Sequence, residues 1–391
     1  FHTSLKQFGF SSRPSQLFTL FPDLSHDYDE QALRLFLESG YIPAPYSVYR
    51  QIRKLPAAHY LIADENGIEI KRYWDFRGIE PDTTWKTRSE GDLLDELDEV
   101  LTRSVGTRMA SDVPLGAFLS GGIDSTLMVA LMAKQSSIPI KTFTIGFDIK
   151  AYDESEHANS VAQYLQTEHH CEHLHVNQIV DLMPKFLQHF DEPFFDSAAF
   201  PTMAVSRVAK QHVTVSMTGD GGDELFGGYH YYRIAKMMSP FFSLTGQMRK
   251  SLAEIVGLVP RHNFKPLSAA LKQRNSARAF AFSRSIAKDF RGILSTNVLQ
   301  NTEGLMDLFE QQARTFPDGL HASEEGMRLD MLYTLNDDYL QKTDVASMAF
   351  SLESRAPMLS REVIEWSMRL PVSWKIKGNI NKTDEVLDNV Y

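Results

Sequence analysis

The chain has 391 residues, of which 43% are hydrophobic and 23% are charged, and its formal net charge is −10. This acidic balance argues against a general surface for nucleic acids or anionic membranes, because both need clustered cations. No apolar stretch is long enough to span a bilayer. We therefore expect a globular protein of two domains that acts on small molecules, with neither a nucleic acid nor a membrane as partner.

The first 75 residues predict a small unit of mixed structure. The pattern at 29–40 is typical of a short helix closed by Gly40. Apolar and β-branched residues at 60–62 and 68–73 flank a polar turn and predict a β-hairpin. The polar segment 76–90 is interpreted as a linker between two domains.

From residue 91 onward, strands and helices are expected to alternate. A capping box at 89–92 marks the start of a helix with an apolar face. The expected strands are 115–119, 140–147, 169–175 and 212–218, and the expected helices are 124–135, 154–167, 177–190 and 198–210. This alternation predicts a parallel sheet flanked by helices, with ligands at the carboxyl ends of the strands. Beyond residue 230 only helical patterns continue, to about residue 370.

A short polar turn at 120–125 (SGGIDS) lies between two apolar runs, at 115–119 and 127–132. This pattern is typical of a buried strand, a loop and the start of a helix. Adjacent glycines let backbone amides approach an anion, and the helix directs its positive end at the same place. Asp124 can hold Mg²⁺ against polyphosphate oxygens, so the turn suits a triphosphate or pyrophosphate. A turn without any chemistry is the alternative.

The segment 142–148 (TFTIGFD) has the pattern of a buried strand that ends at the same sheet edge. Its Ile145 could pack against a flat base, and glycine at position 146 would avoid a clash with a ribose. A core strand that contacts no ligand fits the same pattern.

The single cysteine, Cys171, excludes an intramolecular disulfide and indicates a cytoplasmic location. It lies in the segment 169–175 (HHCEHLH), whose histidines raise the question of a metal site. The spacing fits none of the usual zinc patterns, and strand alternation would place Cys171, His173 and His175 on one face. We interpret the segment as a packed strand with partly exposed histidines.

A second glycine-rich loop, at 218–228 (TGDGGDELFGG), follows the expected strand at 212–218. Its glycines indicate a backbone that lies close to a ligand, and three carboxylates stand near its centre. Carboxylates beside an anion site are costly unless a cation lies between them. Asp223 together with Asp124 would form such a magnesium site, facing the departing pyrophosphate. A glycine-rich turn with solvated acids is the alternative.

The loop at 120–125 resembles the PP-loop of enzymes that cleave ATP between its α- and β-phosphates. Together with the segments at 142–148 and 218–228, it resembles the synthetase domain of glutamine-hydrolysing asparagine synthetases. Further segments carry the same resemblance, at 152–155, 191–193 and 342–357 (KTDVASMAFSLESRAP). The resemblance implies an α/β fold of the PP-loop ATP pyrophosphatase type, similar to adenine nucleotide α-hydrolases. In this fold helices flank a parallel sheet and a helical C-terminal part follows.

Residues 1–75 resemble the end of the family's glutaminase domain, in the segments 1–6, 40–45, 52–56 and 72–74. The implied organisation is the remnant of an N-terminal Ntn-type α+β glutaminase domain at 1–75, a linker at 76–90 and an ATP-pyrophosphatase domain at 91–391. The family's glutaminase nucleophile is an amino-terminal cysteine whose own α-amine is the base. Because the chain starts at Phe1 and Cys171 lies in the other domain, we expect no glutamine hydrolysis by this polypeptide.

The resemblance also implies a reaction, in which ATP activates the side-chain carboxylate of aspartate as β-aspartyl-AMP and ammonia then attacks it. ATP and Mg²⁺ are the implied cofactors, and aspartate or a related acid and ammonia or glutamine are the substrates. A homodimer is the expected assembly. The family's AMP contacts fall on Leu119, Ile145, Thr218 and Gly219. Its pyrophosphate contacts fall on Ser120, Gly121, Gly122, Asp124 and Ser125, and its metal ligands on Asp124 and Asp223.

The catalytic roles that the resemblance implies fall on Asp220 and Lys382. Asp220 stands where many members have a glutamate that helps to deprotonate the incoming ammonia, and it is one methylene shorter. Lys382 falls near a late lysine that neutralises the phosphates, but the hydrophobic-Leu-Arg pattern that usually follows is missing. A solvated surface lysine is the alternative. Arg355 either contacts the substrate or ties helices together.

Two further positions depart from the family pattern. Val345 stands where an arginine is common, and Ser360 stands where an aspartate is usual. Loss of a cation near a polyanion is expected to weaken binding or to change the acceptor acid.

Three hypotheses therefore remain open. The first is an asparagine synthetase, or an amidotransferase of the same family that acts on another carboxylate in polysaccharide or secondary-metabolite synthesis. The second is a non-catalytic nucleotide-binding homologue or fragment. The third is another PP-loop enzyme that acts on tRNA or GMP, which the acidic charge and the second glycine loop disfavour.

Overall fold

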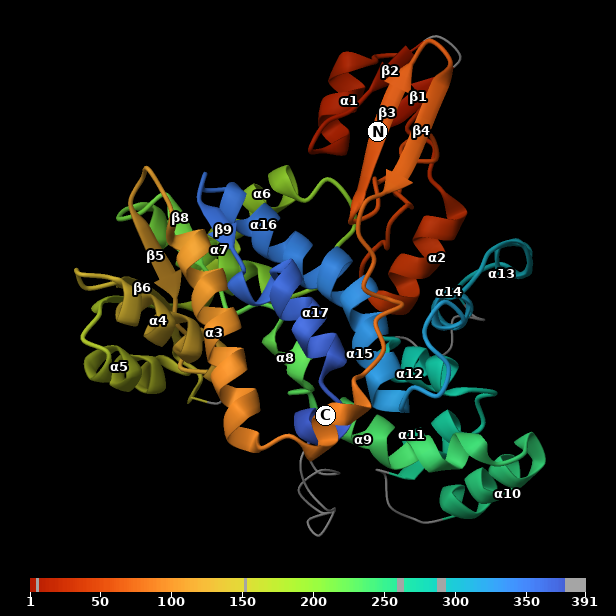
Figure 1. Cartoon of the computed structure of the whole chain (residues 1–391). Coiled ribbons are helices and arrows are strands. Elements are labelled where there is room, and N and C mark those ends of the chain that lie inside the picture. The colour runs from red at the N-terminus through yellow and green to blue at the C-terminus, as the bar shows by residue number, and fades with distance from the viewer. Residues whose placement is uncertain (5–6, 151–152, 259–263, 287–292, 377–391) are drawn as a thin grey trace.

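The computed structural model describes residues 1–4, 7–150, 153–258, 264–286 and 293–376, and Figure 1 shows how their elements are arranged. The N-terminal part holds two small two-stranded sheets, the middle part holds a five-stranded sheet with flanking helices, and the rest is helical. Among these residues no helix is both long and apolar enough to cross a membrane.

The N-terminal part consists of two hairpins and two helices. Its elements are β1 (His2–Ser4), β2 (Gln7–Gly9), α1 (Pro14–Leu20), α2 (Glu30–Ser39), β3 (His59–Asp64) and β4 (Gly67–Arg72). The expected helix at 29–40 is confirmed as α2. The Asp29 carboxylate caps its start by accepting two backbone N–H groups, and Gly40 ends it with φ of +89°. The expected hairpin is confirmed as β3 and β4, which pair antiparallel.

The five-stranded sheet is parallel throughout, in the order β7-β6-β5-β8-β9. Its strands are β5 (Leu115–Phe118), β6 (Lys141–Phe147), β7 (Glu168–Leu174), β8 (Val215–Met217) and β9 (Glu353–Arg355). The first four are the strands that the sequence predicts. The chain runs outward from β5 to β7 and then returns to β8 on the other side of β5.

The fifth strand, β9, corrects the expectation that no strand follows residue 230. It has only three residues, Glu353–Arg355, and two of them are charged, so no apolar run marks it in the sequence. Its conformation comes from parallel pairing with β8, in which Val215 faces Glu353 and Met217 faces Arg355. Tertiary position therefore makes this segment a strand, against its local pattern.

Helices cover both faces of the sheet (Figure 1). They are α3 (Glu90–Met109), α4 (Ile123–Gln135), α5 (Ser155–Tyr164), α6 (Val176–His189) and α7 (Ala199–Lys210). Ser89 caps α3 by accepting the Asp92 N–H. The largest core joins α3, α4 and the strands β5 and β8, with Val105, Val129 and Met217 at most 1% exposed. This core fixes the strand ends from which the loops of the site emerge.

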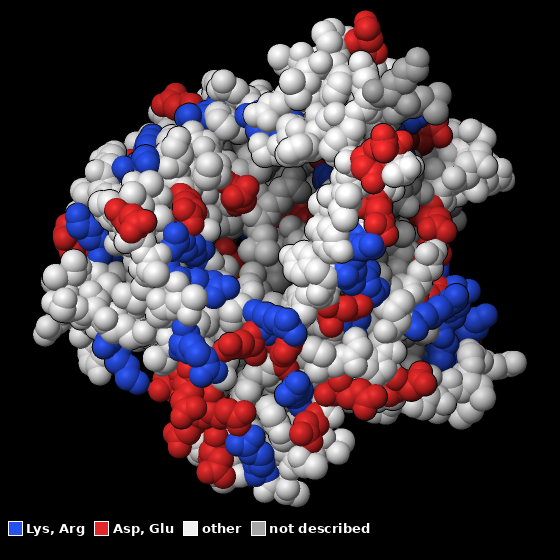
Figure 2. Space-filling view, turned by 45° about the horizontal axis from the view of Figure 1, so that its top comes forward, with Lys and Arg blue, Asp and Glu red and all other residues white. Residues whose placement is uncertain are grey.

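The remaining elements are mostly helical. They are α8 (Gly222–Phe226), α9 (His230–Met238), α10 (Gly246–Gly257), α11 (Phe264–Leu271), α12 (Ser276–Arg284), α13 (Thr296–Asn301), α14 (Leu305–Ala313), α15 (Ala322–Leu332), α16 (Gln341–Met348), α17 (Arg361–Arg369) and α18 (Val372–Lys375). Short 3₁₀ turns of the described residues lie at 83–87, 239–243 and 357–359. A π-helical turn at Leu335–Leu340 joins α15 to α16. On the face shown in Figure 2, Lys and Arg side chains lie scattered among Asp and Glu side chains.

The segment 76–90, which the sequence predicts to be a linker, packs against the main core. Phe76 and Trp85 are buried there, 8% and 9% exposed. The centre of the Trp85 ring lies 5.4 Å from that of the Trp366 ring in α17. The backbone carbonyl of Trp85 accepts the Trp374 indole N–H at 3.2 Å. The segment therefore belongs to the same packed unit as α17.

Replacement of this buried indole tests that packing. Trp85→Ala is expected to lower the free energy of unfolding by about 3–5 kcal/mol, because it removes a large aromatic side chain from the core. Lys86→Ala, one residue away and exposed, should change it by less than about 0.5 kcal/mol. Urea denaturation followed by circular dichroism measures both. Equal stability of the two variants would mean that the segment is a detached linker.

Candidate active site

Two loops meet at one edge of the sheet because they follow adjacent strands. β5 and β8 pair in parallel, so the first loop (119–125) and the second loop (218–228) start at the same edge. The strand order reverses here, since β6 and β7 lie on one side of β5 and β8 lies on the other. Such a reversal is the place where open α/β sheets form a ligand crevice.

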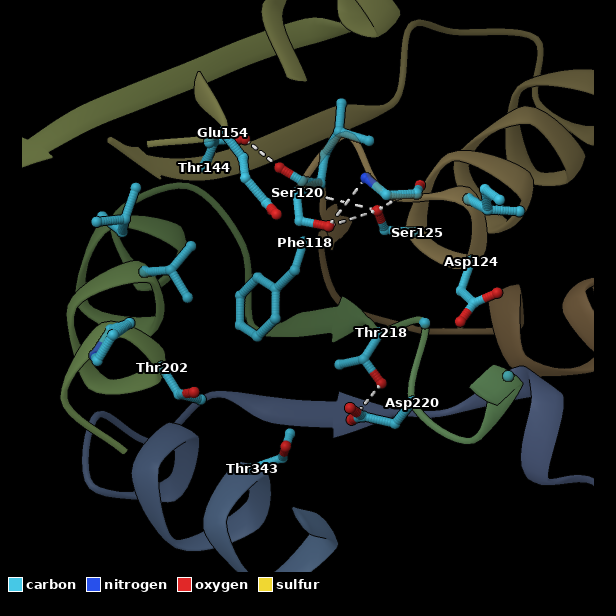
Figure 3. A pocket seen from close by; sticks show the side chains of 18 of the residues that line it. Phe118, Ser120, Asp124, Ser125, Thr144, Glu154, Thr202, Thr218, Asp220 and Thr343 are labelled. Atoms are coloured by element: carbon cyan, nitrogen blue, oxygen red, sulfur yellow. Dashed lines mark hydrogen bonds between the residues drawn. The ribbon is translucent and has the colours of Figure 1, made fainter. Parts of the chain in front are cut away.

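Hydrogen bonds within the first loop fix its shape (Figure 3). The Ser120 hydroxyl lies 3.0 Å from that of Ser125 and accepts the Gly122 N–H at 3.2 Å. Gly121 has φ of +83°, and a Cβ there would lie 2.8 Å from the Ala158 nitrogen, so this turn requires glycine. Gly122 is the N-cap of α4, and the unpaired N–H groups of its first turn favour an anion beside the loop.

The two loops touch through glycines of the second loop. A Cβ on Gly219 would lie 2.8 Å from the Ser125 nitrogen, and one on Gly222 would lie 2.3 Å from the Asp124 carboxyl group. A side chain at Gly219 would therefore push against the backbone of the first loop, and one at Gly222 would displace the Asp124 carboxyl group. With glycines there, Asp124 and Asp223 come to line the same cavity.

Asp124 and Asp223 share surroundings that disfavour their negative charge. Burial and the Asp223 carboxylate raise the pKa of Asp124 to about 6. Burial also raises the pKa of Asp223. The two acids are thus close enough to repel each other, and a divalent cation between them would remove that repulsion.

Asp220 also belongs to the second loop and lines the same cavity. The Thr218 hydroxyl donates to its Oδ2 at 2.8 Å (Figure 3). Burial raises the pKa of Asp220, while the hydrogen bond from Thr218, the Lys342 ammonium and the Thr343 hydroxyl act in the opposite direction. A buried carboxyl that is balanced by one cation is a suitable acid–base group.

The cavity above the two loops has a volume of about 710 Å³. Its lining includes most of the residues that the sequence predicts for AMP, pyrophosphate and metal, namely Leu119, Ser120, Gly122, Asp124, Ser125, Ile145, Thr218, Gly219 and Asp223, together with the predicted catalytic residue Asp220. Gly121 lies within the first loop, against α5. The volume is that of a pocket for a molecule of nucleotide size.

The end of the cavity near β6 is apolar, with Phe143, Ile145 and Phe147 in its wall. The Leu119 N–H donates to the Phe143 carbonyl at 2.9 Å, which ties the first loop to β6. At the neighbouring Gly146, a Cβ would lie 2.7 Å from the His173 ring. The glycine there makes room for β7 rather than for a ribose, which corrects the sequence-based interpretation.

Arg355 lies on β9 and is not among the residues that line this cavity. Its guanidinium donates to the carbonyls of Arg108 and Ala110 at the end of α3, and it pairs with Glu353 at 2.6 Å. Of the two roles left open by the sequence, these contacts favour the one that ties elements together. Lys382, the other distant candidate, lies outside the described residues.

The departures at Val345 and Ser360 lie away from the nucleotide cavity. Val345 lines a second cavity, of about 810 Å³, together with residues of the N-terminal part. It is not among the residues that line the first cavity. Ser360 is the N-cap of α17 and accepts the Val363 N–H at 3.3 Å. Serine and aspartate are both good N-caps, so this exchange preserves the helix start. Neither position is in the wall of the first cavity, and the expected effect on polyanion binding or on the acceptor acid stays a prediction.

Sequence reasoning missed Lys342, Thr343 and Glu154 as members of the cavity wall. Each lies inside a segment that carries the family resemblance, but a motif does not say which of its side chains face a ligand. The expected strand at 169–175 is confirmed as β7, with Cys171 exposed. In the described part of the chain, no three or more His, Cys, Asp and Glu side chains converge on a metal-sized site, so the Asp124–Asp223 pair would need phosphate oxygens to complete a coordination shell.

Comparison with known proteins agrees with this geometry. The Asparagine synthase family model matches residues 96–383, and the Glutamine amidotransferase domain model matches residues 1–74. The chain belongs to the asparagine synthase family. The mixed α/β architecture with its parallel sheet and helical C-terminal part is the one expected from that membership.

Two of the relatives match nearly all of this chain and a third matches half of it, and in each case the match covers only part of the relative's own length. The chain is 28% identical over 364 residues to asparagine synthetase [glutamine-hydrolyzing] 1 of Bacillus subtilis, covering 91% of this chain and 55% of that protein. It is 32% identical over 368 residues to a putative asparagine synthetase of Mycobacterium bovis, covering 91% and 54%. A putative asparagine synthetase of Methanocaldococcus jannaschii is 40% identical over 204 residues, covering 51% and 38%. The chain therefore spans about half the length of the first two relatives.

The site of this family member fits ATP and Mg²⁺. The first loop offers two hydroxyls and the start of α4 to phosphate oxygens, and the close contact of Gly222 with Asp124 leaves no side chain between the paired acids. Asp124 and Asp223 would hold the metal, and the apolar end with Ile145 would accept the base.

Gly222→Ala tests the contact between the loops. A methyl group 2.3 Å from the Asp124 carboxyl must displace that carboxyl, so the affinity for MgATP is expected to fall at least about tenfold, which is about 1.4 kcal/mol. Isothermal titration calorimetry measures it, and circular dichroism checks the fold. Gly246→Ala is the matched control, because a Cβ there meets no atom within 4 Å. Unchanged affinity in Gly222→Ala would contradict the geometry.

Binding of Mg²⁺ is expected to weaken in acid. With the pKa of Asp124 at about 6, only about a tenth of this carboxyl is ionised at pH 5, so its contribution to metal affinity should fall about tenfold between pH 7.5 and pH 5. The folding stability of the metal-free protein depends on pH in the opposite direction. Because the pKa of Asp124 in the folded protein lies above the unfolded value of 3.8, its contribution to the free energy of unfolding falls as pH rises from about 4 to 6.

Calorimetric titration of MgATP at both pH values measures this effect. Asp124→Asn serves as the reference, since it keeps the titration of the nucleotide and removes that of the carboxyl. The same pH dependence in both proteins would mean that Asp124 does not bind the metal.

Proposed function

We propose that this chain catalyses the ATP-dependent conversion of aspartate to asparagine. The carboxylate of the aspartate side chain is activated as β-aspartyl-AMP, and ammonia, released from glutamine in the full-length enzyme, then displaces AMP. The observation that carries the proposal is the contact between the two glycine-rich loops, which brings Asp124 and Asp223 to one cavity of nucleotide size. Membership of the asparagine synthase family supports the choice of reaction.

In the first step, an aspartate carboxylate oxygen forms a bond to the α-phosphorus of ATP, and the bond from this phosphorus to the oxygen that bridges to the β-phosphorus breaks. Two anions must approach each other, so positioning and charge neutralisation dominate catalysis. Ser120, Ser125 and the amides at the start of α4 would hold the departing pyrophosphate. Bound between Asp124 and Asp223, Mg²⁺ would supply the main positive charge.

In the second step, the ammonia nitrogen attacks the acyl carbon, and the bond from this carbon to the phosphate oxygen breaks, so AMP leaves. The nitrogen must lose one proton to become a neutral amide. Asp220, buried beside Thr218, would accept that proton on its carboxylate.

Another acceptor acid within the same family is the main alternative. Of the three departures that raised it, Val345 and Ser360 are not in the wall of the nucleotide cavity, whereas Asp220 lines it. The choice of aspartate therefore rests on the family, and a panel of acids can test it.

Exchange of labelled pyrophosphate into ATP measures the first step. We expect exchange that needs both Mg²⁺ and aspartate, and asparagine formation when ammonia is added. Exchange with another acid and none with aspartate would mean that the other acid is the acceptor, while the mechanism of activation stays as proposed. Absence of exchange with every acid tested would favour a nucleotide-binding homologue without turnover.

Asp124→Asn is expected to reduce the exchange rate at least about 100-fold, because an amide cannot replace a charged metal ligand. Asp181→Asn, an exposed position in α6, is the matched control and should keep the rate of the unmodified chain. Retained exchange in Asp124→Asn would overturn the metal assignment.

A further inference from the structure

Lys342 is the cation of the nucleotide cavity. Among the described residues that line the cavity it is the sole lysine or arginine, and its side chain is only 14% exposed. It lies in the second position of α16, next to Thr343, which also lines the cavity. A buried ammonium in a site for polyanions needs to be held in place, because its long side chain is otherwise free to turn.

Asp196 holds this ammonium from outside the cavity. Its Oδ2 lies 2.8 Å from Lys342 Nζ, and its Oδ1 accepts the Ala198 N–H at 2.8 Å. The carboxylate is therefore fixed at both oxygens, one by the backbone that leads into α7 and one by the lysine. Asp196 does not line the cavity, and no motif in the sequence singles it out.

Two further groups surround the ammonium. Lys342 Nζ lies 5.0 Å from the centre of the Tyr339 ring, an attractive cation–π contact. Asp338, in the π-helical turn, interacts with both Lys342 and Asp196. Lys342 thus interacts with several acids, and its direct ion pair is with Asp196.

Lys342 also acts on Asp220. The two interact electrostatically, each favouring the charged form of the other. Asp220 is the carboxylate that accepts the proton in the proposed second step, and it is buried, so it depends on a nearby cation to remain ionised. If Asp196 did not hold it, the ammonium would be free to turn toward Asp220 and pair with the carboxylate that must accept the proton. It would equally be free to turn toward Asp338 and away from Asp220.

We propose that Asp196 is a positioning residue, which fixes Lys342 at the distance from Asp220 that keeps this carboxylate ionised and free to accept the proton of the attacking nitrogen. The proposal rests on the proposed function and adds to it a residue outside the cavity. It separates the two half-reactions: activation of the acid depends on the two loops and the metal, whereas amide formation depends in addition on the Asp196–Lys342 pair.

Asp196→Asn tests this separation. The amide keeps an oxygen for the Ala198 N–H, so the start of α7 is preserved, but the negative charge is lost. We expect asparagine formation from ammonia to fall at least about tenfold, with kcat rather than the KM for ATP affected, while ATP–pyrophosphate exchange stays within about threefold. Asp196→Glu, which keeps the charge, should restore most of the synthesis.

Asp98→Asn is the matched control, since Asp98 forms an exposed ion pair with Lys134 at 3.2 Å. It should leave both half-reactions unchanged. Equal loss of exchange and synthesis in Asp196→Asn, or no loss of either, would overturn the proposal, because a merely structural residue would not affect one half-reaction alone.

A second measurement does not depend on turnover. In protein that carries ¹³Cε-lysine, the NMR signal of Lys342, assigned with Lys342→Arg, should titrate at lower pH in Asp196→Asn than in the unmodified chain. An unchanged titration would show that Asp196 does not hold the ammonium. Absence of pyrophosphate exchange in the unmodified chain would instead contradict the proposed function, and the NMR titration would still decide whether Asp196 positions Lys342.

Discussion

The close approach of two loop backbones at the ends of β5 and β8 is the constraint on which the site depends. A Cβ on Gly219 or Gly222 would lie within 3 Å of atoms of the first loop. Side chains at these positions would separate Asp124 from the second loop and divide the cavity. Glycine is therefore required here for space, while at Gly121 it is required for a positive φ. Because β5 and β8 pair in parallel, the two loops also start side by side at the same edge of the sheet.

This arrangement places carboxylates that repel each other around one cavity, and a bound cation can remove that repulsion. Asp124, Asp220 and Asp223 are all partly buried acids with raised pKa values, and all line one cavity. Such a group lowers the stability of the empty protein, because charged carboxylates lose hydration on folding. A divalent cation would offset the repulsion at one end, and the Lys342 ammonium offsets it at the other. The acids thus favour a metal ion and a proton, whereas the ammonium favours an anion.

The packing around the site shows what the residues that depart from the family pattern contact. Ser360 caps the start of α17. Val345 lies in the wall of another cavity, between the N-terminal part and α16. Arg355 joins β9 to the end of α3 and so holds the edge of the sheet next to β8. In each case the contacts of the side chain, rather than its distance in sequence from a motif, determine its role.

The sequence by itself determined the first four strands of the parallel sheet, their crossover helices and the two glycine-rich loops, because parallel strands that alternate with helices and tight turns leave strong local patterns. It could not reveal β9, whose three residues carry no apolar run and become a strand only by pairing with β8. It could not reveal the role of Gly146 or of the Asp196–Lys342 pair either, since these depend on segments that are distant in the chain. Local pattern encodes elements and turns, whereas the partners of a buried charge are decided only when the elements pack together.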